Sequence, residues 1–241
     1  MDYGIQLYSV AYYMGKDVKG TLRKLSEMGF TKVEPAGFFG VAAEDFKAWC
    51  DEFGLTVCGA HCGFGDLEGD NFSKMVKYLK TIGCKRYIIP WENSEDAAAI
   101  DSFIANIKKY QPMLAAEGIE LAFHNHSGEF CVNKDGQIPH IELQKRSDIK
   151  FQIDIYWSYR GGVKPLYVLE QLKDRLVSIH LKDGDMQNGK PLGMGTAPVA
   201  EALAWARKNN MDIVVENECS SDEVSLDEAK ICIDYLKSLE K

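Results

Sequence analysis

The chain alternates short β-rich runs with longer amphipathic runs, and this alternation limits the folds that it can adopt. Eight apolar runs favour strands, and most are followed by a run with helical periodicity. They are YGIQLYSV from Tyr3, TKVEPAG from Thr31, LTVCGAHC from Leu55, KRYIIPW from Lys85, IELAFHNH from Ile119, KFQIDIYW from Lys150, LVSIHLKD from Leu176 and DIVVENE from Asp212. Eight β-then-α units without a break in composition predict a closed (β/α)₈ barrel, as a single domain over residues 1–241. The alternative is an open doubly wound sheet.

Glycines mark the ends of several expected helices. Gly29, Gly54, Gly83 and Gly118 each close an amphipathic run just before the next strand, where we expect a left-handed C-cap. IPHIELQKRS is the expected short helix before the sixth strand.

Composition and charge exclude several classes of protein. Hydrophobic residues make up 46% of the 241 residues and charged residues 27%, as in ordinary globular proteins. The N-terminus lacks signal-peptide features and no run reaches membrane-spanning length, so we expect a cytoplasmic protein without a membrane partner. A net charge of −8 argues against nucleic-acid partners. The seven cysteines form no CxxC pair, which indicates reduced packing residues.

Polar side chains gather where the apolar runs end. In a barrel of this type the C-terminal strand ends converge on one mouth, which holds the catalytic groups. These ends supply Glu34, His61, Trp91, His124 with His126, Asp154 with Trp157, His180 with Lys182 and Asp183, and Glu216 with Glu218. The sequence therefore predicts an active site at this mouth.

Four of these side chains form a candidate metal site. Asp154, His180 and Glu216 end three successive strands, and His124 ends the strand before them. Imidazole and carboxylate ligands without thiolates suit Mn²⁺, Co²⁺, Fe²⁺ or Zn²⁺. The alternative is a hydrogen-bonded polar network without a metal.

The stretch LAFHNHSGEF places further chemistry beside His124. Alternation along a strand puts His124 and His126 on one face, and Glu129 follows three residues after His126. We expect His126 and Glu129 to face a substrate. Alternatively SGEFCVNKDGQI forms a small hairpin with its turn at residues 134–136, which could direct Glu129 to solvent.

Motifs along nearly the whole chain resemble one family. IQLYSV, VEPAGFFG, FHNHSGEF, QIDIYW, SIHLKD, PLGMGTAPV and VVENE occur in the order found in sugar phosphate isomerase/epimerase proteins of the xylose isomerase-like TIM-barrel superfamily. That superfamily includes xylose isomerases, ketose 3-epimerases, hydroxypyruvate isomerases, inosose dehydratases, 3-keto-glycoside lyases and endonuclease IV. The resemblance implies a TIM barrel that acts on a small carbohydrate, with assembly into a homo-oligomer left open.

The resemblance also implies roles for individual residues. The family's metal-binding aspartate, histidine and glutamate match Asp154, His180 and Glu216. Many of its isomerases carry a glutamate ligand where this chain has His124, and in that respect the chain resembles inosose dehydratases. Glu129 could swing back to supply the missing carboxylate.

The reactions that fit share proton removal from a carbon beside a carbonyl, with a metal stabilising the enediolate. We expect a sugar isomerase or epimerase, with Glu129, His126 and Lys182 as catalytic residues. A dehydratase or glycoside lyase is the alternative, and His124 opposite Glu216 favours elimination because the two faces of the substrate then meet unlike groups.

The remaining expectations concern the rim of the site. Glu34, His61, Trp91 and Trp157 are the expected substrate contacts, although each could be a structural residue, and Lys182 could instead pair with Asp183. GKPLGMGTA is an expected mobile rim loop. Two other classes remain open: an endonuclease IV-like nuclease, which needs more histidine ligands, and a non-catalytic sugar-binding barrel without a metal.

Overall fold

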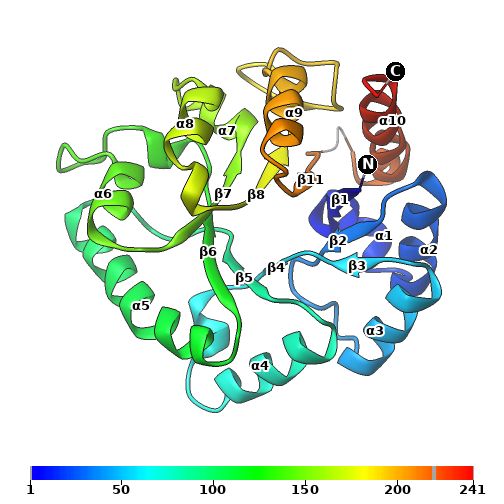
Figure 1. Cartoon of the computed structure of the whole chain (residues 1–241), viewed down its shortest axis with the longest axis horizontal. Coiled ribbons are helices and arrows are strands. Elements are labelled where there is room, and N and C mark those ends of the chain that lie inside the picture. Colours follow the sequence, from blue (N-terminus) through cyan, green and yellow to red (C-terminus); the bar gives the residue numbers. More distant parts are fainter. Residues whose placement is uncertain (1, 219–220, 241) are drawn as a thin grey trace.

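Parallel strands form a barrel inside a ring of helices in the computed structural model, which describes residues 2–218 and 221–240 (Figure 1). The strand order is β3-β2-β1-β11-β8-β7-β6-β5-β4, and every pairing within this sheet is parallel. The strands are β1 (Tyr3–Gln6), β2 (Lys32–Glu34), β3 (Thr56–Val57), β4 (Ala60–His61), β5 (Arg86–Ile89), β6 (Glu120–His124), β7 (Lys150–Asp154), β8 (Leu176–Leu181) and β11 (Ile213–Val215). A parallel bridge between Ala36, two residues after β2, and His61 on β4 closes the barrel. The predicted (β/α)₈ barrel is therefore confirmed and the open sheet is wrong.

The third strand of the barrel is broken, which the sequence did not predict. The run from Leu55 was expected to be one strand, but β3 pairs with β2 while β4 pairs with β5, and Gly59 lies between them. A Cβ atom on Gly59 would lie 2.7 Å from Glu34 Oε2 and 2.7 Å from Ile88 Cδ1. The break and the missing side chain thus make room for the carboxylate of Glu34 inside the barrel.

The helices surround the barrel (Figure 1), and the hydroxyl of Tyr3 on the first strand donates a hydrogen bond to Glu240, just after the last helix, at 2.7 Å. The helices are α1 (Ala11–Met14), α2 (Val18–Met28), α3 (Ala43–Glu52), α4 (Asn71–Thr81), α5 (Ala97–Ala116), α6 (Pro139–Arg146), α7 (Ile155–Arg160), α8 (Pro165–Gln171), α9 (Val199–Lys208) and α10 (Ser225–Ser238). The four glycines expected to close helices all have positive φ, from 68° at Gly54 to 107° at Gly29. The expected short helix IPHIELQKRS is α6, which begins at Pro139.

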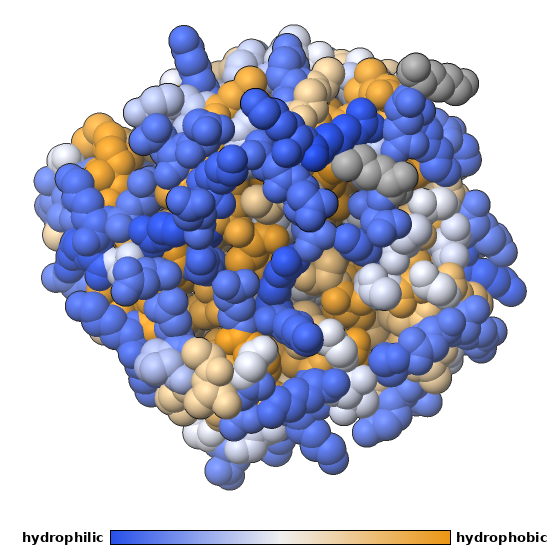
Figure 2. Space-filling view, viewed as in Figure 1, coloured by the Kyte–Doolittle hydropathy of each residue, from blue (hydrophilic) through white to orange (hydrophobic). Residues whose placement is uncertain are grey.

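Apolar side chains fill the space between strands and helices, and hydrophilic side chains cover much of the outer surface (Figure 2). Large buried side chains such as Phe103 on α5 and Phe123 on β6 pack edge to face with ring centroids 4.9 Å apart. Among the described helices, none combines the length and apolar character needed to cross a membrane.

An ion-pair network lies at the N-terminal end of the barrel strands. Lys32 at the start of β2 and Arg86 at the start of β5 both donate to Asp212, which precedes β11. Burial by itself would raise the pKa of Asp212, but the two cations outweigh it and hold the pKa below its usual range. These charges tie three strands together at the end opposite the mouth.

His140 is a buried histidine on α6. Its ring packs between Phe130 and Phe151, at centroid distances of 4.5 and 5.0 Å. Neither ring nitrogen has a hydrogen-bond partner among the described residues. Burial, helped by nearby Arg175, lowers the pKa of His140 to about 3, so the folded protein keeps this ring neutral.

We expect His140 to make the fold less stable in mild acid. An unfolded histidine takes up a proton near pH 6.5, so the unfolded state binds more protons between about pH 6.5 and pH 3, and stability falls as the pH falls through that window. At pH 5 the contribution amounts to about 2 kcal/mol. His140→Phe should lose less unfolding free energy than the native chain between pH 7 and pH 5, measured by urea denaturation. Equal losses in the two proteins would contradict this role.

Candidate active site at the mouth of the barrel

The structure brings together the four side chains predicted to bind a metal. His124 ends β6, Asp154 ends β7, His180 lies on β8 and Glu216 follows β11, and these strands are neighbours in the sheet. Each side chain offers one ligand atom, and the four atoms lie within 4.8 Å of one another. All four residues are buried. We call this set the four-ligand cluster.

Two atoms of the four-ligand cluster are buried without a hydrogen-bond partner in the described part of the chain. They are Nδ1 of His124 and Oδ2 of Asp154. The other oxygen of Asp154 accepts a hydrogen bond from the backbone N–H of Trp157 at 2.8 Å, which fixes the carboxylate at the start of α7. Leaving a buried polar atom unpaired is costly, and a divalent cation bound to such an atom would remove that cost. The residues present therefore fit a metal ion.

The pKa of Asp154 supports the same interpretation. Burial raises the pKa of its carboxyl group to about 7, although the nearby Lys182 ammonium opposes the shift. An ordinary aspartate is ionised well below pH 7, so the raised pKa means that burial destabilises the ionised carboxylate of Asp154. A bound cation would stabilise that ionised form.

His180 lies between two carboxylates. Its Nδ1 is 2.6 Å from Glu216 Oε2 and its Nε2 is 2.7 Å from Glu34 Oε1. Burial alone would lower the pKa of His180, but these two carboxylates raise it to about 10. A proton on each ring nitrogen satisfies both contacts. A metal bound on the Glu216 side would replace one of these protons while Glu34 held the other.

Glu34 lies below the four-ligand cluster, with both of its oxygens bonded to protein groups. Oε1 accepts a hydrogen bond from Gln6 Nε2 at 2.9 Å, and Oε2 accepts one from Gln152 Nε2 at 2.7 Å. The side chain is 1% exposed. Burial would raise the pKa of Glu34, but contacts with His61 and His180 hold it well below its usual range. We expected Glu34 to contact the substrate, but these protein contacts give more support to a role in orienting His180.

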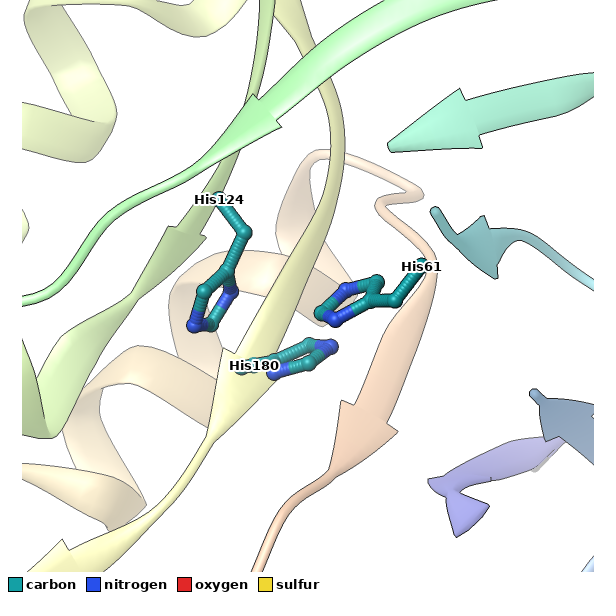
Figure 3. A group of neighbouring side chains, drawn as sticks. All are labelled: His61, His124 and His180. Carbon is teal, nitrogen blue, oxygen red and sulfur yellow. The ribbon is translucent and has the colours of Figure 1, made fainter. Parts of the chain in front are cut away.

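His61 belongs to the same inner layer. Its Nε2 is 2.7 Å from Gln152 Oε1 and 3.1 Å from Glu34 Oε1. Its ring is stacked on that of His180, with centroids 5.4 Å apart and planes 10° from parallel. Figure 3 shows the imidazoles of His61, His124 and His180 directed toward one another. A substrate contact from His61 remains a prediction. The contacts of its Nε2 with Gln152 and Glu34 do not favour it, because this nitrogen already has protein partners.

Gln6 and Gln152 are site residues that the sequence analysis missed. Gln6 ends β1 and Gln152 lies two residues before Asp154 on β7, so Gln152 and Asp154 share a face of that strand. Gln152 also donates to Ser178 Oγ at 2.9 Å. For Gln152 the sequence did hold a signal, because its amide side chain lies two residues before the predicted ligand Asp154 and therefore on the same face of the strand.

Lys182 reaches the edge of the four-ligand cluster. Its Nζ is 3.5 Å from Glu216 Oε1, 3.0 Å from Glu218 Oε1 and 4.6 Å from the centroid of the Trp157 ring. Burial by itself would lower the pKa of Lys182, but the surrounding carboxylates, Glu216 foremost, raise it. The ammonium group therefore stays charged. Its ion-pair partners are Glu216 and Glu218, and the alternative pairing with Asp183 is not seen in the described residues.

Asp183 instead anchors the loop that follows β8. Its carboxylate accepts backbone hydrogen bonds from Gly184 and Ala197 through Oδ1, and from Gly193 and Gly195 through Oδ2, at 2.8 to 3.1 Å. The short strands β9 (Asp183–Gly184) and β10 (Gly189–Lys190) pair in the same loop. A Cβ atom on Gly195 would lie 2.2 Å from Asp183 Oδ1. These contacts argue against the mobility that we expected for GKPLGMGTA.

His126 and Glu129 lie higher in the mouth. The His126 ring is 5.1 Å from that of His124 and 5.4 Å from that of Trp157, and its buried Nδ1 has no partner among the described residues. Glu129 is buried and accepts a hydrogen bond from the His126 backbone N–H at 2.8 Å. The four-ligand cluster contains His124 and not Glu129.

The chain around Glu129 is a turn followed by a loop, with no strand pairing in the described residues. Gly128–Phe130 form a short 3₁₀ turn, and a tight turn at residues 134–136 is closed by a hydrogen bond from Asn133 N–H to Gln137 O at 2.7 Å. The position of the turn was predicted, but a hairpin ladder is absent from this described segment.

The two predicted tryptophans face a common groove. Trp91 is 62% exposed and Trp157 is 9% exposed, and both line a cavity of about 750 Å³ together with His126 and Glu129. The indole N–H of Trp157 is buried without a partner in the described residues. Trp91 is therefore not a core residue.

A comparison with protein families identifies the chain. The family model for the xylose isomerase-like TIM barrel matches residues 22–239. The chain belongs to this family. It is 22% identical to an inosose dehydratase of Geobacillus kaustophilus (strain HTA426) over 186 residues, which cover 67% of this chain and 60% of that relative. The chain thus spans about 60% of the length of this curated relative.

Solved structures share the fold. A sugar phosphate isomerase/epimerase from Parabacteroides distasonis ATCC 8503 has a TM-score of 0.85 at 24% identity, covering 98% of this chain and 97% of its own. The probable 3-DHS dehydratase AsbF of Bacillus anthracis has a TM-score of 0.78 at 12% identity, with 98% and 99% covered. The 3-keto-D-glucoside 4-epimerase YcjR of E. coli has a TM-score of 0.75 at 19% identity, with 100% and 99% covered.

Asp183→Asn should destabilise the protein, because an amide N–H₂ would replace one oxygen that accepts two backbone N–H groups. We expect a loss of about 2 kcal/mol in unfolding free energy, measured by urea denaturation, and faster amide hydrogen exchange at residues 193–197. Asp45→Asn, at an exposed position on α3, is the control and should change stability by less than about 0.5 kcal/mol. Native exchange rates in Asp183→Asn would refute the anchoring role.

Proposed function

We propose that this protein is a metal-dependent enzyme that removes a proton beside the carbonyl of a keto-sugar or related polyol, as a sugar isomerase or epimerase. One observation carries the proposal. Four converging nitrogen and oxygen ligands lie at the C-terminal mouth of the barrel, and two of their atoms are buried without a partner among the described residues.

His124, Asp154, His180 and Glu216 would hold the ion. Two imidazoles and two carboxylates suit Mn²⁺, Co²⁺, Fe²⁺ or Zn²⁺. When bound, the cation supplies Lewis acidity toward a carbonyl oxygen and its neighbouring hydroxyl. Glu34 would keep His180 in a fixed orientation through its bond to Nε2.

His126 is the proposed proton acceptor. Burial lowers the pKa of His126, so its imidazole is neutral near pH 7, as a proton acceptor must be. Glu129 holds the turn that carries His126 through the His126 backbone N–H. Of the two roles open to Glu129, positioning His126 has more support from the geometry than direct contact with the substrate.

Lys182 is the proposed electrophile. Its charged ammonium lies at the edge of the four-ligand cluster, where it would donate a hydrogen bond to a substrate oxygen as negative charge develops. Because ion pairs with Glu216 and Glu218 already hold the ammonium group in place, it would need little movement to donate this hydrogen bond.

A carbon–oxygen lyase is the second candidate. Neutral His126 and charged Lys182 are chemically unlike groups, which suits removal of a proton and departure of an oxygen better than proton transfer between equivalent carboxylates. The relative named inosose dehydratase supports this candidate.

The proposed ligand is a small carbohydrate, and the proposed compartment is the cytoplasm. A net charge of −8 disfavours a nucleic-acid substrate, which would bring its own negative charges. No membrane partner is proposed.

The metal is tested on purified protein incubated with Mn²⁺ or Co²⁺ and freed of excess ion. We expect about one divalent ion per chain by elemental analysis and a rise in melting temperature on adding the ion. Asp154→Asn should bind the ion at least tenfold more weakly, because the amide cannot supply the anionic oxygen. Absence of bound ion together with an unchanged melting temperature would leave the polar-network alternative.

Three variants separate ligand from proton acceptor. His124→Ala should lose metal affinity, whereas His126→Ala should keep the metal and lose about 10²- to 10⁴-fold in turnover. Glu129→Gln should keep the metal with a smaller loss. Turnover is followed by NMR in D₂O with ketoses, inososes and 3-keto-glycosides, which reports both exchange and elimination. If Glu129→Gln loses the metal and His124→Ala keeps it, our assignment of the fourth ligand is wrong.

A further inference from the structure

A groove leads outward from the mouth of the barrel. It begins at His126 and Trp157 and continues between the segment after β5, residues 91–95, and the segment after β6, residues 126–134. Its volume is about 750 Å³, a size that proteins use for ligands well beyond a single sugar ring. We call it the outer groove.

The walls of the outer groove are bonded to each other. Lys134 N–H donates to Glu95 O at 3.0 Å, and Asn133 Nδ2 donates to Ser94 O at 3.3 Å. The two segments are joined again where the backbone N–H of Ala97 donates to Asp135 Oδ2 at 2.9 Å. The outer groove is thus formed before any ligand arrives, which lowers the entropic cost of binding there.

The aromatic side chains of the outer groove form a path away from the four-ligand cluster. The His126 ring contacts that of His124 at one end and that of Trp157 at the other. Trp91 also lines the outer groove and leaves 62% of its surface exposed, and Val132 in the same lining is 65% exposed. An indole face exposed on a prebuilt wall suits the apolar C–H face of a sugar ring, while hydroxyl groups reach the polar side chains of the groove.

The charges of the outer groove disfavour a phosphate group. Glu92, Glu95 and Glu129 line it, and the cation among its lining residues, Lys134, is paired with Glu95 at 2.6 Å. A phosphate would meet uncompensated carboxylates, since anion sites rely on arginine, lysine or free backbone N–H groups.

We propose that the outer groove is a second sugar subsite, and that the substrate is a neutral glycoside or disaccharide. Its reacting ring lies over the four-ligand cluster, and its second ring stacks on Trp91. The position of the reacting ring rests on the proposed function, but the stacking on Trp91 does not depend on it.

Calorimetry with cellobiose, maltose, lactose and trehalose tests the subsite, with glucose and glucose 6-phosphate as single-ring probes. We expect at least one disaccharide to bind about tenfold more tightly than either single-ring probe. Trp91→Ala should remove that advantage, and Trp91→Phe should restore most of it. The control is Tyr167→Ala on α8, because Tyr167 is 65% exposed and lies outside the outer groove.

Three results would overturn the proposal. They are equal affinity for glucose and every disaccharide, tighter binding of glucose 6-phosphate, and a loss in Trp91→Ala no greater than in Tyr167→Ala. The measurement is separable from the proposed reaction. A protein that binds no metal but shows the Trp91 effect would contradict the proposed function and support the subsite.

Discussion

The bond between the Glu34 carboxylate and the His180 ring is the interaction on which the site depends. A carboxylate inside a barrel is costly unless each oxygen has donors, and Gln6, Gln152 and His180 provide them. Room for the carboxylate comes from the missing side chain of Gly59. Once Glu34 is fixed, it determines the plane of His180 and the nitrogen that faces Glu216. The geometry of the four-ligand cluster at the mouth therefore depends on Glu34, which lies below it inside the barrel.

Much of this arrangement could be predicted from the sequence, for a simple reason. The ligands end strands, and parallel strands of a barrel bring their ends to one mouth, so His124, Asp154, His180 and Glu216 could be grouped without coordinates. The two glutamines of the supporting layer could not be grouped in this way. In the sequence Gln6 lies inside the apolar run from Tyr3, and it meets Glu34 through the register of β1 and β2, whereas Gln152 reaches Glu34 from β7, which is not a neighbour of β2 in the sheet. Register depends on tertiary packing and not on local pattern.

The break in the third strand and the position of Glu129 show the same limit. LTVCGAHC has the composition of one strand, but the side chain that enters beside Gly59 comes from another strand, so the local pattern holds no trace of it. Likewise HNHSGEF predicts that Glu129 is near His126, and not that its carboxylate turns back to the His126 backbone N–H. Composition and periodicity specify elements, whereas contacts across elements decide what each polar group binds.

Asp183 holds the loop after β8 through four backbone N–H groups, and not through the side chains of that loop. Main-chain hydrogen bonds specify a path for the backbone, and they restrict residue identity only where a side chain would collide, as at Gly195. Exposed positions such as Met186 and Met194 can therefore change while the loop keeps its shape. Substitutions at such exposed rim positions can therefore change the surface chemistry around the mouth without changing the backbone that forms it.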